Sequence, residues 1–207
     1  AESAVFKRSA AGADASDAEG LVHELQQAIQ AFKQPTDWLL LGGDFNSRIH
    51  GLKDTVVADE DTVAVFSALE RLHMAPPLAA HDYSGIRDRE SADKTVTAAG
   101  RALCDLARRN GLVFLNGRVH GDIPGQLTFI ARGPNGGGSA IDLFLADTDL
   151  FRRAGFGGED QLMHVGQLAY YSIGGHLISD HCPVHLQLHG FDRSVLEQGR
   201  GGVGVQL

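Results

Sequence analysis

The chain has only two cysteines and few aromatic residues among its 207 residues. Two cysteines are too few for a disulfide framework. Cys104 falls in a helical pattern and Cys182 in a strand pattern, so we expect two buried thiols that form no disulfide. Buried free thiols fit a reducing compartment, so we expect an intracellular protein of the nucleus or cytoplasm.

Long apolar runs are also lacking. No run approaches the roughly 20 residues of a membrane span, and the first twenty residues show no signal peptide, so we expect no membrane association. The net charge of −8 argues against broad nonspecific affinity for nucleic acid but leaves a nuclease open. Arginines that could line a substrate groove or a solvated helix face are Arg101, Arg108, Arg109, Arg118, Arg132, Arg152 and Arg153.

A hydrophobic content of 43% allows one domain with a real core. Residue spacing predicts helices over 16–32, 62–74 and 97–110, with a polar loop at 79–94. Strands are expected at 38–44, at 182–188 and near Leu112, Leu127, Ile141 and Leu177, and the glycine-rich segment 133–138 reads as a hairpin connection. Helices early and strands late predict an α/β fold, a layered α/β sandwich.

The segment Trp38-Leu-Leu-Leu-Gly-Gly-Asp-Phe-Asn46 is an apolar run that stops at two glycines and then presents a carboxylate and an amide. Because side chains alternate along a strand, Asp44 and Asn46 are expected on one face, with Phe45 turned into the core. A metal or a phosphate could be bound there. A strand followed by an Asx-turn would account for the same residues without any function.

Two further motifs follow. Ser139 to Ala146 is an apolar strand that contains one carboxylate, Asp142, which needs a partner because an unpaired buried charge is costly. Ser179-Asp180-His181 then stands at the start of an alternating strand.

In this order, Gly-Asp-Phe-Asn, Ser-x-Ile-Asp and Ser-Asp-His resemble the endonuclease/exonuclease/phosphatase superfamily, which includes pancreatic deoxyribonuclease, abasic-site endonucleases and inositol-phosphate phosphatases. The resemblance extends from about Asp37 to Leu188. Segments 100–107, 110–118 and 127–129 look like the endonuclease domains of non-LTR retrotransposon polyproteins. This implies a DNA endonuclease, with a reverse transcriptase elsewhere in the polyprotein.

Phosphodiester hydrolysis needs an aligned water, a cation and a group that stabilises the transition state. Asp44 would orient or deprotonate the water, and Asn46 would hold that water or a phosphate oxygen. His181 would donate to the scissile phosphate, while Asp142 would fix its tautomer and favour its charged form. Asp180 would lie near the metal, with Asp44. These roles match those that the superfamily assigns to the motif residues.

The implied cation is Mg²⁺, with Mn²⁺ as a substitute, because the expected ligands are oxygen atoms. Zinc is not expected. His181, His185 and His189 are four residues apart, which would suit a metal site on a helix, but Pro183 and the alternating apolar residues predict a strand. His164 and His176 are left open as ligands or solvated side chains.

Superfamily members carry an asparagine and a metal-binding glutamate on strands well before the Gly-Asp-x-Asn strand. This chain starts only about forty residues upstream of that strand, and Glu2 is not given the role. We therefore expect residues 1–190 to be a partial domain without its N-terminal part and residues 191–207 to be a flexible glycine-rich tail. Two alternatives stay open: a non-catalytic remnant or interaction module of the same fold, and a phosphoesterase acting on inositol phosphate, a lipid head group or RNA.

Overall fold

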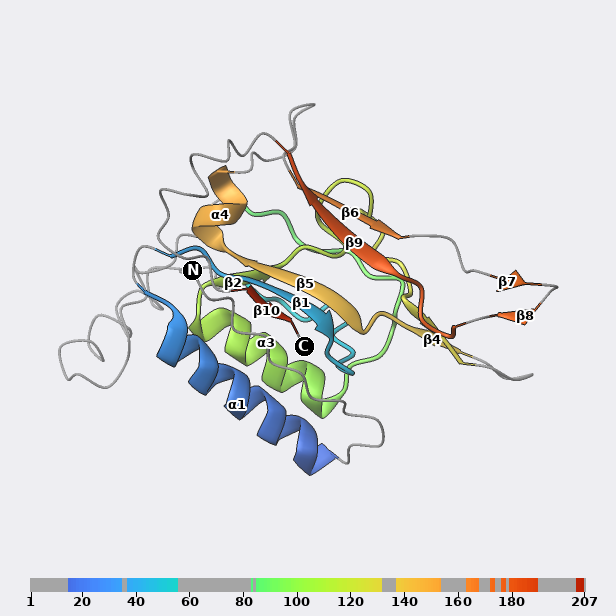
Figure 1. Cartoon of the computed structure of the whole chain (residues 1–207), viewed down its shortest axis with the longest axis horizontal. Coiled ribbons are helices and arrows are strands. Elements are labelled where there is room, and N and C mark those ends of the chain that lie inside the picture. Colours follow the sequence, from blue (N-terminus) through green and yellow to red (C-terminus); the bar gives the residue numbers. More distant parts are fainter. Residues whose placement is uncertain are drawn as a thin grey trace.

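The computed structural model describes residues 15–34, 37–55, 83, 85–131, 137–153, 163–167, 172–173, 176–177, 179–189 and 204–206. Over these residues the chain is mixed α/β, with the two longer helices on one side of mainly antiparallel strands (Figure 1). None of the described helices is long and apolar enough to cross a membrane.

The described helices are α1 (Ala15–Phe32), α3 (Ala98–Arg109) and α4 (Thr148–Arg153). The strands are β1 (Leu40–Asp44), β2 (Leu112–Phe114), β3 (Phe129–Ile130), β4 (Gly138–Ser139), β5 (Asp142–Asp147), β6 (Met163–Gln167), β7 (Ser172–Ile173), β8 (His176–Leu177), β9 (Val184–Leu188) and β10 (Gly204–Gln206). The central sheet has the order β10-β1-β5-β2, and β3–β4, β6–β9 and β7–β8 form two-stranded antiparallel ribbons.

One face of the central sheet is covered by α1 and α3 (Figure 1). Alternate residues of the strands point to this face, among them Leu41 of β1 and Leu143 and Leu145 of β5. They pack with Leu25 of α1 and Leu103 of α3, all almost fully buried. This alternation identifies the helix side of each strand.

The opposite face carries the intervening residues of the same strands. Val113 of β2 and Ala146 of β5 pack there with Met163 and Val165 of β6, and the ribbon β6–β9 covers this side (Figure 1). The parity of positions 40, 42 and 44 in β1 and of 142, 144 and 146 in β5 places Asp44 and Asp142 on this face too. The two acidic residues therefore face away from α1 and α3.

Helix α3 has the predicted boundaries and the signals that explain them. The Thr97 side chain accepts a hydrogen bond from the Gly100 N–H, as an N-cap does, and Gly111 follows the helix with a positive φ of 64°. Gly100 is required by packing, since a Cβ there would lie 2.0 Å from the Arg48 carbonyl oxygen. The prediction of a helix over 97–110 is confirmed.

Two ion pairs with buried carboxylates tie the loops to this framework. The Arg118 guanidinium donates two hydrogen bonds to Asp54, at 2.7 and 2.8 Å, and both side chains are almost completely buried. Arg48 pairs with Asp93 at 2.7 Å. Burial opposes the charge of Asp93, but hydrogen bonds from Arg48 and from backbone N–H groups lower its pKa on balance. Arg118 thus belongs to the core, so it is not one of the arginines open to a substrate.

Other expectations have mixed outcomes. Both cysteines are buried and form no disulfide, and burial raises the pKa of the Cys104 thiol to about 12. The glycine-rich segment does connect a hairpin, β3–β4. Within the segment 191–207, expected as a tail, the structure describes only Gly204–Gln206, which form β10 and pair in parallel with β1. The helix expected over 62–74 lies outside the described residues.

Candidate functional site

The register of two strands places two carboxylates opposite each other. β1 and β5 are antiparallel, and the last residue of β1, Asp44, pairs with the first residue of β5, Asp142. Like charges directly opposite each other on one face of a sheet are destabilising, so this pair requires a compensating group. The neighbouring pair in the register is Gly42 and Phe144, and glycine leaves room for the ring, because a Cβ at Gly42 would lie 2.6 Å from it.

The compensating group is His181. Its backbone segment is held against β3: the Ile130 N–H donates to the Asp180 carbonyl at 2.9 Å, and the Cys182 N–H donates to the Thr128 carbonyl at 2.6 Å. The Phe129 ring stands edge-on to the His181 ring, with centroids 5.1 Å apart. Residues far apart in the sequence therefore fix the imidazole between the two aspartates.

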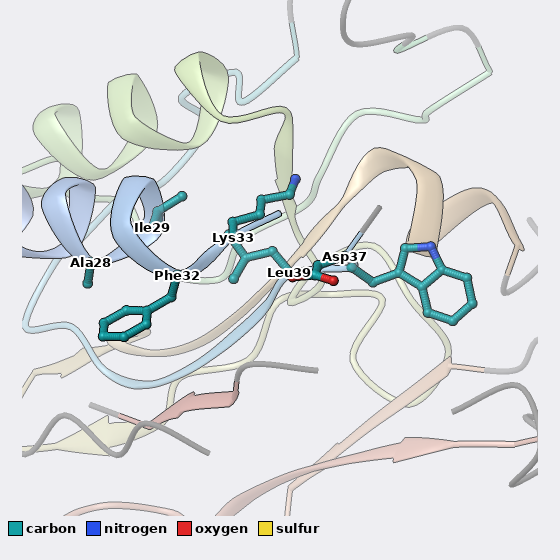
Figure 2. Close-up of a pocket in the computed structure, with 7 residues that line it drawn as sticks. Ala28, Ile29, Phe32, Lys33, Asp37 and Leu39 are labelled. Atoms are coloured by element: carbon teal, nitrogen blue, oxygen red, sulfur yellow. The ribbon is translucent and has the colours of Figure 1, made fainter. Parts of the chain in front are cut away.

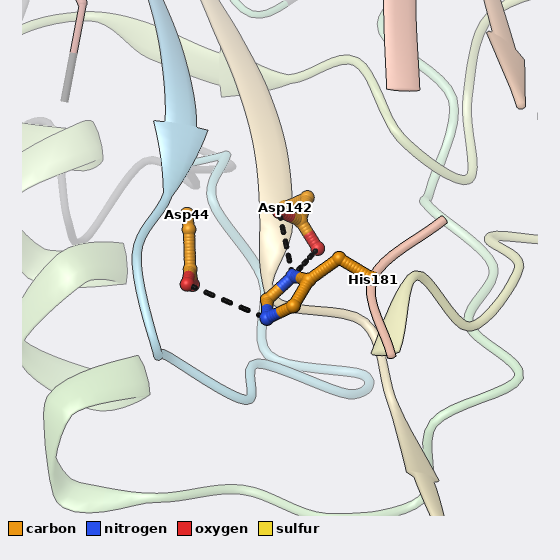
Figure 3. Close-up of side chains that lie close together, drawn as sticks. All are labelled: Asp44, Asp142 and His181. Carbon is orange, nitrogen blue, oxygen red and sulfur yellow. Dashed lines mark hydrogen bonds and ion pairs between the residues drawn. The ribbon is translucent and has the colours of Figure 1, made fainter. Parts of the chain in front are cut away.

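Figure 3 shows the imidazole with one carboxylate at each ring nitrogen. His181 Nδ1 lies 3.1 and 3.2 Å from the two Asp142 oxygens, within hydrogen-bond distance. Nε2 lies 3.9 Å from Asp44 Oδ2, a distance suited to an ion pair but too long for a hydrogen bond. The predicted proximity of Asp44, Asp142 and His181 is thus present.

The environment of Asp142 differs from that of an ordinary surface aspartate. Burial raises the pKa of its carboxyl above the usual range, and the nearby charge of Asp44 acts in the same direction. Hydrogen bonds with Thr128 and His181 oppose the rise. The side chains of His181 and Asp44 are about one third exposed, so a ligand can reach them from solvent.

Asn46 does not share a strand face with Asp44 as expected, because β1 ends at Asp44 and Asn46 adopts a φ of +48°. Its backbone N–H donates to Asp44 Oδ1 at 2.9 Å, and its side-chain amide lies 3.5 Å from Oδ2. The Asx-turn that sequence left as an alternative is therefore present. Phe45 turns into the core as predicted. In this position Asn46 orients the Asp44 carboxylate.

Asp180 contributes a backbone contact beside the site. Its carbonyl accepts the Ile130 N–H, which anchors the loop before β9. Among the residues that the structure describes, the one group of three side chains able to hold a metal ion is Asp44, Asp142 and His181, and Asp180 is not a member. The expected place of the Asp180 carboxylate near the metal stays a prediction.

Two polar residues that support the site had no assigned role from sequence. The Thr128 hydroxyl accepts hydrogen bonds from the backbone N–H groups of Ile141 and Asp142, at 3.1 and 3.0 Å. The Asn116 side chain accepts the Phe144 N–H at 2.7 Å and so holds β5. Both are buried polar residues flanked by apolar strand residues, and this pattern is the signal that could have identified them.

A separate hollow lies at the end of α1, away from this site (Figure 2). Its lining is mostly apolar and consists of Ala28, Ile29, Phe32, Lys33, Asp37, Trp38 and Leu39. The Asp37 carboxylate accepts the Gln34 N–H, and the Lys33 ammonium lies 3.9 Å from Asp147, so the charged groups at its rim are paired within the chain. The hollow shows no converging polar groups that would indicate chemistry.

The chain matches no protein-family model, and neither a curated protein nor a solved structure matches it. Its candidate site is therefore interpreted from its own geometry. Two carboxylates and an imidazole that meet where β1 ends and β5 begins can orient a water, exchange a proton and bind a cation through oxygen atoms.

Proposed function

We propose that the chain is a metal-dependent phosphodiesterase, most simply a DNA endonuclease of the retroelement type with a layered α/β sandwich of the endonuclease/exonuclease/phosphatase superfamily. The observation that carries the proposal is the His181 ring held at Nδ1 by Asp142 and facing Asp44 at Nε2. A carboxylate that fixes one ring nitrogen and leaves the other available is the arrangement of histidines in hydrolytic sites.

Each residue then has a role defined by its position. Asp44 accepts a proton from the attacking water and is itself oriented by the Asn46 N–H. In its protonated form His181 donates from Nε2 to an oxygen of the scissile phosphate and so offsets charge in the transition state. Asp142 holds the ring through Nδ1 and does not touch the substrate.

The donor set fits Mg²⁺ or Mn²⁺ at the carboxylate side of the site. Mg²⁺ takes one or two carboxylates, several waters and substrate phosphates, and it avoids nitrogen ligands. Asp44 is the accessible carboxylate, whereas Asp142 is engaged by His181 and Thr128. When bound, the cation would supply a Lewis acid for the phosphoryl oxygens.

The choice of DNA rests on the resemblance to retroelement endonucleases and not on a contact surface. Two conspicuous residues of the Leu-Asn-Gly-Arg segment, Asn116 and Arg118, are buried and hold the fold together. They therefore do not grip phosphates. A nuclease that binds several phosphates loses affinity steeply with salt, whereas an enzyme for inositol phosphate or another small ester does not.

The test is nicking of supercoiled plasmid by the purified chain in Mg²⁺, compared with chelator alone. Asp44→Asn and His181→Ala are each expected to reduce the nicking rate at least about a hundredfold, since each removes a group that acts in the transition state. His189→Ala is the matched control, because this histidine is exposed beyond the end of β9.

Equal nicking by wild type and His181→Ala would contradict the proposal and indicate a contaminating nuclease. If the folded wild-type chain binds Mg²⁺ but cleaves neither plasmid, RNA nor an inositol phosphate, the second candidate holds: a non-catalytic remnant or interaction module. This candidate is favoured by the composition of the described cluster, which contains two aspartates but not the metal-binding glutamate of the superfamily.

A further inference from the structure

Three histidines lie in a row, separate from the site above: His164 on β6, His185 on β9, and His120 on a segment that bridges to His164. The His164 ring is 5.4 Å from the ring of His120 and 6.0 Å from the ring of His185, measured between centroids. The strand register explains the second spacing. His185 pairs with Gly166 across the ribbon, so His164 and His185 are diagonal neighbours on the face opposite Val165, which points into the core.

Glycines create the room for these rings. A Cβ on Gly166 would lie 2.3 Å from His185 Cε1, and a Cβ on Gly121 would lie 2.5 Å from His164 Nε2. Larger residues at either position would displace an imidazole. The backbone also joins the segments, because the Val165 N–H donates to the His120 carbonyl at 3.0 Å.

Two nitrogens in this row lack the partner that burial demands. Nδ1 of His164 and Nδ1 of His185 are both buried and have no hydrogen-bond partner. A buried polar atom without a partner destabilises the folded chain, and an ion or a water would relieve that cost. An imidazole nitrogen is a preferred ligand of zinc, nickel and copper.

We propose that His164 and His185 form a binding site for a divalent transition-metal ion such as Zn²⁺, with solvent completing its coordination. A zinc–nitrogen bond is about 2 Å long, so two imidazoles on one tetrahedral ion have centres roughly 5–6 Å apart. The observed 6.0 Å falls in that range. The His120 ring lies next to the His164 ring of this pair. A bound ion would hold β6 and β9 together, because each strand supplies one ligand.

The site is independent of the proposed hydrolysis, since it shares no residue with Asp44, Asp142 and His181. The described residues contain one group of three mutually close ligating side chains, and that group is the hydrolytic site. The histidine site therefore has two protein ligands, which predicts moderate affinity. The sequence predicted no zinc site at His181, His185 and His189, because that segment was expected to be a strand. In the site proposed here, the second ligand of His185 is His164, which lies on the adjacent strand.

The experiment is a calorimetric titration of the full chain with Zn²⁺ in the presence of excess Mg²⁺, which occupies oxygen-rich sites. His164→Ala and His185→Ala are each expected to weaken Zn²⁺ binding about tenfold or more. Gly166→Ala keeps every histidine but displaces the His185 ring, and it is expected to weaken binding as well. Circular dichroism of each variant verifies that the fold is retained.

His189→Ala and His181→Ala are the controls and are expected to leave this binding event in place. Unchanged Zn²⁺ affinity in both His164→Ala and His185→Ala would overturn the proposal. So would the absence of heat and of any thermal stabilisation in wild type at millimolar Zn²⁺, since an ion that binds the folded chain must raise its melting temperature.

Discussion

Replacing Arg118 by methionine tests whether this arginine builds the core or serves the substrate. The change keeps a long side chain but leaves the Asp54 carboxylate, which is 1% exposed, without its cation. Breaking a buried ion pair from one side costs about 3–5 kcal/mol. For a chain of this size that is a fall in melting temperature of roughly 6–20 °C.

The double variant Asp54→Asn, Arg118→Met separates charge from packing. The asparagine oxygen can still accept the Phe114 N–H that Asp54 accepts at 2.7 Å. The carbonyls of Phe114 and Arg87 lose the donors that Arg118 provides. The free energy of unfolding of the double variant is thus expected to fall by about 2–3 kcal/mol less than the sum of the losses in the two single variants.

Urea unfolding of the wild type, both single variants and the double variant measures this coupling, with unchanged m-values as the condition for comparison. A cost below about 1 kcal/mol for Arg118→Met would refute the buried-pair reasoning. If that stable variant had also lost plasmid nicking, Arg118 would have to be reassigned to the substrate.

Three further predictions follow from the site and its supports. Gly100→Ala places a Cβ 2.0 Å from the Arg48 carbonyl and is expected to destabilise the chain by several kcal/mol, at least about 2, in thermal melts; a neutral result would mean that α3 can shift freely. Thr97→Ala removes the N-cap and is expected to cost about 1–2 kcal/mol in urea unfolding, whereas Thr97→Ser should recover most of it. Because burial raises the pKa of Asp142, the nicking rate is expected to fall on acidification at a higher pH than it would with an exposed aspartate. A nicking rate that falls only in the pH range where exposed carboxyl groups titrate would contradict this. The same rise means that Asp142 favours the folded state less as pH increases through its folded-state pKa, the opposite of the usual aspartate.

The local sequence was enough to define several elements. The apolar run before Gly42 and Gly43 predicted a strand, and the run from Thr97 to Gly111 predicted a capped helix, because caps and periodicity act over a few residues. The alternating segment at the C-terminal side predicted β9. The candidate residues Asp44, Asp142 and His181 were also visible as polar residues at the ends of apolar strands.

Only the tertiary structure decided which of these residues meet. The antiparallel register sets Asp44 against Asp142, and the contacts of β3 with the loop before β9 bring His181 to both while Asp180 serves as a backbone anchor. No local pattern encodes a register between strands about a hundred residues apart, since it depends on how all the apolar faces pack together.

The same limit applies to the partners of buried charges and rings. Sequence left Arg118 among arginines open to solvent, but its partner Asp54 is 64 residues away and both are enclosed by the core. His164 and His185 were separate ambiguous histidines until β6 and β9 paired. The sequence by itself determined several of the helices and strands and which side chains carry chemistry, because those properties are local. Long-range packing determined the distances between them.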